Sequence, residues 1–447
     1  MKRIIALLLT LVMVLGLCAC GGKKEETPAE KPAEGTEAPA ETPADVPVVK
    51  IGALYPFSGA SATAGPEAEF IISYIVDKVN KEGGLDGLGG AQIEVIYGDT
   101  QADGQIALTE FERLVNVEGV TSLLGGYNTA VANTLSQYVI AAQVPMLMTS
   151  AAGNDAFSVE NNYVYHANSV NANQVPSLVE VAAFQDKLCG QPRTSLVVYD
   201  SADYGANAWE EKQQVAEATG NTVVGVPVVS GAADYSAEIA KIKENEGVAA
   251  YIEPTLIMDD AIRFMKQMYD KGVSMPVFAA GGGYLQGDFI EQCGDAAEYV
   301  FSTAWWFDDL KNATYDPDWA CEISDAFAAE FGYPFNENAS CVWTGMWALV
   351  DALERTTEDD PEAIAVALDA TDIKGEHPAL LFTLADHIKY EDGLMPDGVT
   401  TLYNQNVFDD AIAWAYIKDG AYRVVYPESH ASAEYPLEWP IPAVADR

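Results

Sequence analysis

From Val48 onward, short apolar segments alternate with longer segments of helical periodicity. Segments 48–56 (VVKIGALYP), 92–99 (QIEVIYGD) and 145–150 (PMLMTS) are apolar over most of their length. Strands of this kind are typical of parallel sheets that helices cover on both faces, because neither side of such a strand meets water. The pattern therefore predicts an α/β fold with parallel sheets.

The alternation falls into two series, which segment 163–169 (YVYHANS) separates. The first series runs from 48 to 150, and the second runs from a predicted helix at 173–188 to a strand at 276–282. The chain from Val48 onward has about 400 residues, enough for two domains with sizeable cores. Two series predict two Rossmann-like lobes rather than one barrel.

Beyond the second series, a strand is predicted at 299–307. Helices are then predicted at 316–331, 338–356 and 360–370. Because too few strands remain for a third sheet, we expect these helices to pack on a lobe already formed. The stretch from about 383 to 447 is rich in Asp, Tyr and Pro and has no clear periodic pattern.

The N-terminus has the organisation of a secretory signal. Lys2 and Arg3 precede an apolar run of about 14 residues, which is too short to cross a bilayer comfortably. The following LCACG resembles the lipobox of bacterial lipoproteins, whose last cysteine becomes residue one and is lipidated. The resemblance implies that Cys20 carries the lipid and that Cys18 leaves with the signal. The alternative is a free thiol pair in a leader; a metal site would need further ligands nearby, and there are none.

Residues 1–19 are therefore expected to be a signal peptide, and residues 20–47 an acidic Pro/Ala/Glu linker that buries no core. No second apolar run approaches membrane-spanning length. We thus expect the protein at the extracytoplasmic face of the cell membrane, anchored by its lipid. A net charge of −43 argues against binding to nucleic acid, because phosphate contacts need clustered Lys and Arg.

Besides Cys20, the mature chain has the cysteines Cys189, Cys293, Cys321 and Cys341. The expected compartment permits disulfides, but the spacings fix no connectivity. A Cys321–Cys341 disulfide between consecutive predicted helices is one interpretation. Small buried thiols are the other.

The sequence contains no recognisable set of catalytic groups. Its four histidines are far apart and lack zinc-type spacing, and it has neither a nucleophile elbow nor a phosphate-binding P-loop. The triplet Gly281–Gly282–Gly283 favours a tight turn, because no lysine and hydroxyl residue follow at P-loop spacing. Asp99 and Asp103 likewise predict a turn rather than a calcium loop. We expect neither catalysis, nor a cofactor, nor a metal.

Small polar and aromatic residues gather where the predicted strands end. They occur at 55–59, 125–129, 149–154, 200–205 and 253–255. Open α/β sheets bind ligands at the carboxyl ends of their strands, and helix N-termini can hold an anion without a fixed positive charge. Each loop alone is ordinary turn and capping chemistry, but five together predict a binding cleft.

In their order along the chain, these segments resemble the type I solute-binding proteins of the branched-chain amino-acid (leucine/isoleucine/valine) transport family of ABC transporters. The resemblance covers about 48–380 and rests on segments 51–59, 80–84, 99–103, 125–129, 145–150, 200–205, 234–236 and 331–334. It implies the type I periplasmic binding protein fold, with two Rossmann-like lobes joined by three crossovers, near 168–172, near 302–306 and after 380. The implied lobes are 48–169 with 303–382, and 170–302 with 383–447.

The same resemblance implies capture of an amino acid or related small carboxylate and its delivery to an ABC permease, which a cytoplasmic ATPase powers. We expect a monomer. The implied first-lobe contacts are Tyr127, Asn128, Thr129, Ser150, Ala152 and Asn154. Their loops would hold the ligand carboxylate, Tyr204 would contact the ligand from the second lobe after closure, and Tyr55 and Phe57 would wall the pocket.

One position departs from the family pattern. Amino-acid binders of this family carry an acid after the strand that corresponds to 276–280, and that acid pairs with the ligand ammonium. Here this place is the glycine triplet, and an unpaired buried ammonium costs about 3–5 kcal/mol. Either Glu253 supplies the charge, or the ligand is a purine, an aromatic acid or an amide without an ammonium. Trp305 and Trp306 either pack on such a ligand or belong to the core of the hinge region.

One other class of protein stays open, and a third is disfavoured. A cell-surface sensor would use the same fold to signal rather than to transport, and the sequence does not distinguish the two. A secreted hydrolase would need a nucleophile and base, which the sequence lacks.

Overall fold

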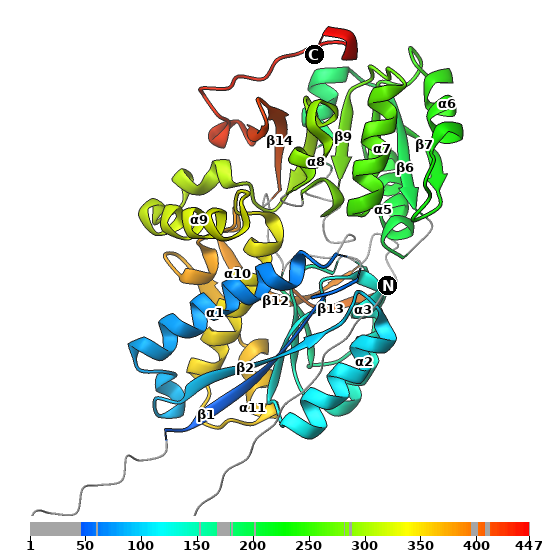
Figure 1. The fold of residues 1–447 in the computed structure, drawn as a ribbon. Helices are drawn as coiled ribbons and strands as arrows, with labels where there is room; N and C mark the ends of the chain where they lie inside the picture. The colour runs from blue at the N-terminus through cyan, green and yellow to red at the C-terminus, as the bar shows by residue number, and fades with distance from the viewer. Residues whose placement is uncertain are drawn as a thin grey trace, which may run out of the picture. The chain divides into compact units, whose positions relative to one another are not determined.

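Two sheets of mostly parallel strands organise the chain from Val46 onward (Figure 1). The computed structural model describes residues 46–59, 61–151, 153–167, 179, 182–200, 203–280, 282–285, 288–394, 401–406 and 412–446. Cys20, Ala152 and Gly281 lie outside these residues. We call each sheet, with the helices that pack on it, a lobe.

The first sheet has eight strands. In spatial order they are β11 (Asp372–Lys374), β12 (His387–Leu394), β13 (Thr401–Asn406), β5 (Val164–His166), β4 (Met146–Met148), β3 (Ser122–Gly125), β1 (Val48–Tyr55) and β2 (Gln92–Asp99). From β13 to β2 all pairings are parallel, and the β11–β12–β13 edge is antiparallel.

Helices cover both faces of this sheet. They are α1 (Ala64–Glu82), α2 (Gly104–Arg113), α3 (Thr129–Ala142), α9 (Pro317–Phe331), α10 (Glu337–Arg355) and α11 (Pro361–Asp369). Ile51 and Ala53 of β1 pack in the core that contains α1 and α10, whereas Leu54 packs with α2 and α3 on the opposite face (Figure 1). Burial on both sides explains why β1 is apolar along its length. The late helices pack on the first lobe, as predicted.

The second sheet has seven strands. In spatial order they are β15 (Ala421–Tyr426), β14 (Ala413–Lys418), β10 (Val300–Ala304), β9 (Val277–Ala280), β8 (Tyr251–Thr255), β6 (Thr194–Asp200) and β7 (Thr222–Val228). Its strands pair in parallel from β10 to β7 and antiparallel at β14 and β15. Its helices include α5 (Asp203–Thr219), α6 (Ser236–Glu244), α7 (Met258–Asp270), α8 (Phe289–Cys293) and residues 182–189.

The order of strands in the two sheets requires three passages between lobes: after β5, after β10 and after β13. The predicted α/β class with two Rossmann-like lobes is therefore confirmed. One expected lobe assignment is corrected, because β12 and β13 lie in the first sheet, although the resemblance implies that 383–447 belongs to the second lobe.

The polar composition of β13 explains why the sequence pattern did not reveal this strand. Asn404, Gln405 and Asn406 are buried, and their amide groups replace apolar packing with hydrogen bonds. Asn404 donates to the carbonyl oxygens of Asn161 and Val164, and Asn406 donates to that of Ala167. A strand stabilised in this way lacks the apolar signal that sequence patterns detect.

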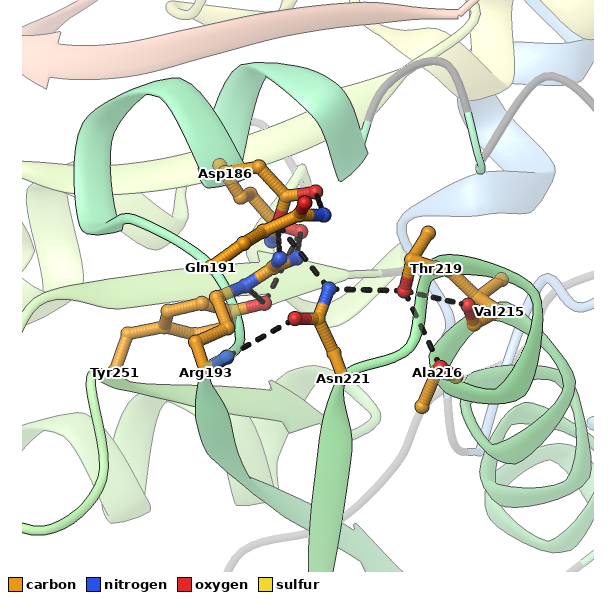
Figure 2. Close-up of polar contacts among 9 residues, drawn as sticks. Asp186, Gln191, Arg193, Val215, Ala216, Thr219, Asn221 and Tyr251 are labelled. Atoms are coloured by element: carbon orange, nitrogen blue, oxygen red, sulfur yellow. Dashed lines mark hydrogen bonds and ion pairs between the residues drawn. The ribbon is translucent and has the colours of Figure 1, made fainter.

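A buried polar network anchors helical residues 182–189 to the second sheet (Figure 2). Arg193, just before β6, forms an ion pair with Asp186 and donates from Nε to the Tyr251 hydroxyl over 3.0 Å. Asn221 accepts from the main-chain N–H of Arg193 and donates to Asp186. These side chains bond to one another across the helix and the sheet, so the network is a structural element of the second lobe.

The four described cysteines are free thiols, so the Cys321–Cys341 disulfide is not formed. Cys293 and Cys341 are buried, and Cys189 and Cys321 are partly exposed. In the part of the chain that the structure describes, no helix has the length and apolar character needed to cross a membrane.

Candidate functional site

A cavity of about 200 Å³ is lined by residues from both lobes. Its first-lobe wall consists of Ser61, Thr63, Glu67, Tyr127, Asn128, Thr129 and Ser150. Its second-lobe wall includes Tyr204, Ala208, Glu211, Lys212, Thr255, Ile257, Ala280, Gly283 and Leu285. The rest of the wall consists of Thr303, Ala304, Trp305, Asn336, Glu337, Asn338, Cys341 and Ile412. The cavity thus lies at the ends of strands, where open α/β sheets bind ligands.

The N-terminus of α3 forms one polar part of the wall. Asn128 is the N-cap residue of this helix, and its side chain makes no capping hydrogen bond. The N–H groups of the first helical turn have no intrahelical partner, and the helix dipole is positive there. Asn128 also places a buried Oδ1 at this wall that accepts no hydrogen bond from the described residues. These groups suit a carboxylate and a neighbouring donor.

Helix α5 supplies the opposite part of the wall. Tyr204, Ala208, Glu211 and Lys212 follow one another at intervals of four, three and one residues, so they share a helix face. Burial raises the pKa of the Tyr204 hydroxyl far above its usual range, which keeps it neutral and able to donate or accept a hydrogen bond. Thr255, at the end of β8, is 1% exposed, and its hydroxyl has no partner among the described residues.

The ammonium of Lys212 is held by two carboxylates. It lies 2.9 Å from Glu253 and 3.6 Å from Glu211, and all three side chains are buried. Burial lowers the pKa of Lys212, but Glu253 and Glu211 raise it by more, so the net shift is upward. Burial also raises the pKa of Glu211 to about 7, although Lys212 opposes this shift. Glu253 is therefore engaged with a cation of the protein itself.

The carboxylate of Glu67 is fully engaged by neutral donors. Its Oε1 accepts from the Tyr333 hydroxyl over 2.9 Å and from Asn336 Nδ2 over 2.7 Å. Its Oε2 accepts from Asn338 Nδ2, also over 2.7 Å. Burial raises its pKa more than these bonds lower it. Glu67 thereby joins α1 to the segment that leads into α10.

Glu337, the first residue of α10, is half-buried at the cavity. Its Oε1 accepts from the main-chain N–H of Trp305 over 3.0 Å. Burial raises its pKa to about 7, and the bond to Trp305 lowers it by less. Trp305 itself lines the cavity, whereas Trp306 is buried against Phe382 in the first-lobe core. The two tryptophans therefore have different environments.

The structure places five of the predicted ligand contacts in the cavity wall: Tyr127, Asn128, Thr129, Ser150 and Tyr204. Tyr55 is buried in the first-lobe core and shares a hydrogen bond of 3.1 Å with Thr149. Phe57 packs edge-on against Tyr97. Asn154 precedes the 3₁₀ turn Asp155–Phe157 and is absent from the wall, and Ala152 lies outside the described residues.

The turns predicted at the aspartates and, for its described residues Gly282 and Gly283, at the glycine triplet are present. Asp99 accepts main-chain N–H bonds from Phe57, Ser58 and Gln101, and Asp103 caps α2. Gly283 belongs to a short 3₁₀ turn after β9. A Cβ at Gly283 would lie 2.1 Å from the carbonyl oxygen of Leu256, so no acidic side chain fits there without a backbone shift.

Sequence reasoning missed the charged part of the wall: Glu67, Glu211, Lys212 and Glu337. The helical spacing of Glu211 and Lys212 from Tyr204 is a usable signal, since these residues share a face. Glu67 and Glu337 lie in the first turns of α1 and α10, where acids are common because they complement the helix dipole. Nothing local distinguishes them from ordinary helix starts.

The described residues contain no group of three or more His, Cys, Asp or Glu side chains that could hold a metal ion. His166 is buried, and its Nε2 bonds to the Ala151 carbonyl oxygen over 2.5 Å. Burial lowers the pKa of His166 to about 3, so this histidine stays neutral.

Comparison with known proteins agrees with this architecture. Residues 48–392 match the family model described as periplasmic binding protein. The chain is 26% identical over 396 residues to Leu/Ile/Val-binding protein homolog 8 of Brucella abortus, and the match covers 86% of this chain and 92% of the relative.

Two solved structures share the fold. A leucine binding protein from Thermotoga maritima superposes with a TM-score of 0.68 at 18% identity, over 85% of this chain and 99% of that one. A solute binding protein of an ABC transporter from Rhodopseudomonas palustris, in complex with 3,4-dihydroxy benzoic acid, superposes with a TM-score of 0.66 at 18% identity. That match covers 84% of this chain and 95% of the other.

Proposed function

The chain belongs to the periplasmic binding protein family, and on that premise we propose that it captures a small solute and delivers it to an ABC permease. The observation that carries this proposal is the cavity, whose wall combines residues of both lobes. A ligand that contacts both lobes stabilises their closed arrangement, which a permease can recognise. No turnover of the solute is expected.

The solute is an amino acid or a related small carboxylate. Its carboxylate would be held at the N-terminus of α3 by Asn128 and Thr129, with Ser150 beside them. Tyr204 and the unpartnered hydroxyl of Thr255 would contact it from the second lobe. The names of the relatives, which include leucine and dihydroxybenzoate binders, support a small carboxylate in general rather than one compound.

Binding is tested by calorimetry of the purified protein with amino acids, nucleobases and aromatic acids. We expect micromolar or tighter binding of at least one carboxylate and of no nucleobase. Thr129→Val replaces the hydroxyl group with a methyl group of similar size. This variant should weaken that binding about 10-fold, as expected for the loss of a hydrogen bond to a charged group. If a nucleobase binds and no carboxylate does, the proposed ligand class is wrong. The transport role is tested separately: disruption of the gene should abolish cellular uptake of the solute that binds.

We also propose that Cys20 is lipidated and that the folded part, acting as a monomer, is tethered at the extracytoplasmic face. The lipobox resemblance of residues 17–21 and the polar composition of 20–47 support this. Mass spectrometry of the mature protein should find an acylated N-terminal Cys20, and Cys20→Ala should release the protein from membranes. A mature N-terminus at any other residue would contradict the anchor.

A further inference from the structure

The cavity wall carries more negative than positive charge. Among the described residues, its side chains include the carboxyl groups of Glu67, Glu211 and Glu337 but a single ammonium, that of Lys212. Each of the first two acids has partners within the protein. Glu67 accepts three hydrogen bonds from neutral side chains, and Glu211 shares Lys212 with Glu253. Glu337, by contrast, accepts one hydrogen bond and has no cation beside it among the described residues.

The carboxylate of Glu337 receives one hydrogen bond, from the main-chain N–H of Trp305 over 3.0 Å. A carboxylate can accept about four hydrogen bonds. No Lys, Arg or His nitrogen of the described residues pairs with Glu337. The undescribed segments between Val46 and Asp446 contain no Lys, Arg or His, so they offer no cation either. Burial raises the pKa of Glu337 to about 7, the direction expected for a carboxyl group without a cation.

The same cavity has a separate place for an anion. The N-terminus of α3 lies in its first-lobe wall and presents N–H donors, and the unpartnered hydroxyl of Thr255 lies in its second-lobe wall. One cavity therefore offers an anion site without a fixed cation and a carboxylate without a fixed cation. A solute that carries both a carboxylate and a protonated amine complements both.

We propose that Glu337 binds the protonated amine of the solute and so restricts the ligands to amino acids and other small carboxylates that carry an amine. This inference rests on the proposed function and narrows its ligand class. The two other candidates for this role, Glu253 and the turn that follows β9, are excluded. Glu253 lies 2.9 Å from Lys212, and the turn at Gly283 has no space for a side chain. Because α10 supplies the charge, the first lobe would hold both ends of the solute.

Matched pairs of ligands test the inference. Calorimetry compares each amino acid with the same molecule lacking its amine: L-leucine with 4-methylpentanoate, and L-phenylalanine with 3-phenylpropanoate. In a pair whose amino acid binds, we expect the amino acid to bind at least about 100-fold more tightly than its deaminated analogue. A buried ion pair with Glu337 accounts for a difference in affinity of this size. Benzoate and 3,4-dihydroxybenzoate, which lack an amine, should bind no better than the deaminated analogues.

Glu337→Gln then removes the charge while keeping an oxygen that can accept from the Trp305 N–H. The ratio of affinities within a pair should fall from about 100 to near 1 in this variant. General damage to the cavity would weaken both members alike and leave the ratio unchanged. Glu330→Gln, an equal charge change at an exposed position of α9, should leave both affinities unchanged.

Two results would overturn the inference while leaving the proposed function intact. One is equal binding of both members of a pair by the wild-type protein, and the other is a preference for the amine that survives in Glu337→Gln. If no carboxylate of either kind binds, the proposed function fails, and the inference fails with it.

Discussion

The ammonium of Lys212 lies 2.9 Å from the carboxylate of Glu253, so a cation on α5 neutralises an acid on the neighbouring β8. Both side chains are buried, and Glu211 lies on the other side of the ammonium at 3.6 Å. This cluster fixes the face of α5 that carries Tyr204 into the cavity. Glu253 therefore stabilises the wall of the cavity rather than acting as a free acid for a ligand.

Removing the cation of this cluster should destabilise the protein strongly. Lys212→Met keeps the length of the side chain but leaves Glu253 and Glu211 buried without a counter-charge, which should lower the free energy of unfolding by about 3–5 kcal/mol. Urea unfolding followed by circular dichroism measures this change. The double variant Lys212→Met with Glu253→Gln should recover at least half of the loss. If Lys212→Met alone were as stable as the wild type, Lys212 would not be the counter-charge of Glu253 and Glu211.

Glu337→Gln should stabilise the ligand-free protein at neutral and alkaline pH. Burial raises the pKa of Glu337 to about 7 from 4.5, so between these values the native state holds a proton that the unfolded chain releases. The contribution of this carboxyl to stability is therefore complete below pH 4.5 and is lost as the pH rises through 7. Gln does not ionise, so the variant should gain about 1–3 kcal/mol at pH 8 and little at pH 4.5.

Urea unfolding of both proteins from pH 4.5 to pH 8 measures this difference. Glu211, whose pKa is also raised to about 7, contributes equally to both proteins and cancels. Glu330→Gln, the same substitution at an exposed position of α9, serves as the control. A gap between Glu337→Gln and the wild type that stays constant with pH would show that the ionisation of Glu337 is not its cause.

Trp305 should report ligand binding by its fluorescence. It lines the cavity, whereas the neighbouring Trp306 is 2% exposed and packs against Phe382. A bound solute changes the surroundings of the first ring but not of the second. Titration of the wild type should shift the emission, Trp305→Phe should remove most of that shift, and Trp306→Phe should keep it. If the emission shift is unchanged in Trp305→Phe, Trp305 does not contact the bound ligand.

Glu67 offers a contrast between loss of size and loss of charge. Glu67→Ala leaves Tyr333, Asn336 and Asn338 without their acceptor and should cost about 2–4 kcal/mol in the free energy of unfolding. Glu67→Gln should cost less, about 1–2 kcal/mol. Its oxygen can accept from Tyr333 and Asn336, and its amide can donate to Asn338 after that side chain rotates by 180°. This rotation gives up the 3.2 Å hydrogen bond from Asn338 Nδ2 to the Ala64 carbonyl oxygen.

The Oδ1 of Asn338 supports this expectation, because it is buried and has no hydrogen-bond partner among the described residues. Thermal or urea unfolding of the two variants measures the contrast. Equal losses in Glu67→Gln and Glu67→Ala would mean that the charge of Glu67, rather than its hydrogen-bonding geometry, stabilises this junction.

Periodic patterns predicted most elements of the fold because each pattern depends on residues close in sequence. The predicted helix 316–331 corresponds to α9 (Pro317–Phe331), and the predicted strand 92–99 to β2 (Gln92–Asp99). The failure at β13 has the opposite cause. Its buried asparagines are satisfied by carbonyl groups about 240 residues earlier in the chain, and no local window contains those partners.

The sequence by itself determined the alternation of strands and helices, the two lobes, and the loops at strand ends that carry Asn128, Thr129 and Ser150. These features follow from apolar periodicity and turn chemistry, which act over short distances along the chain. Only the tertiary structure decided which charges are paired. Lys212 meets Glu253 across two elements, while Glu337 reaches the cavity with no cation beside it. Electrostatic interactions depend on distance and burial in space, and a linear sequence records neither.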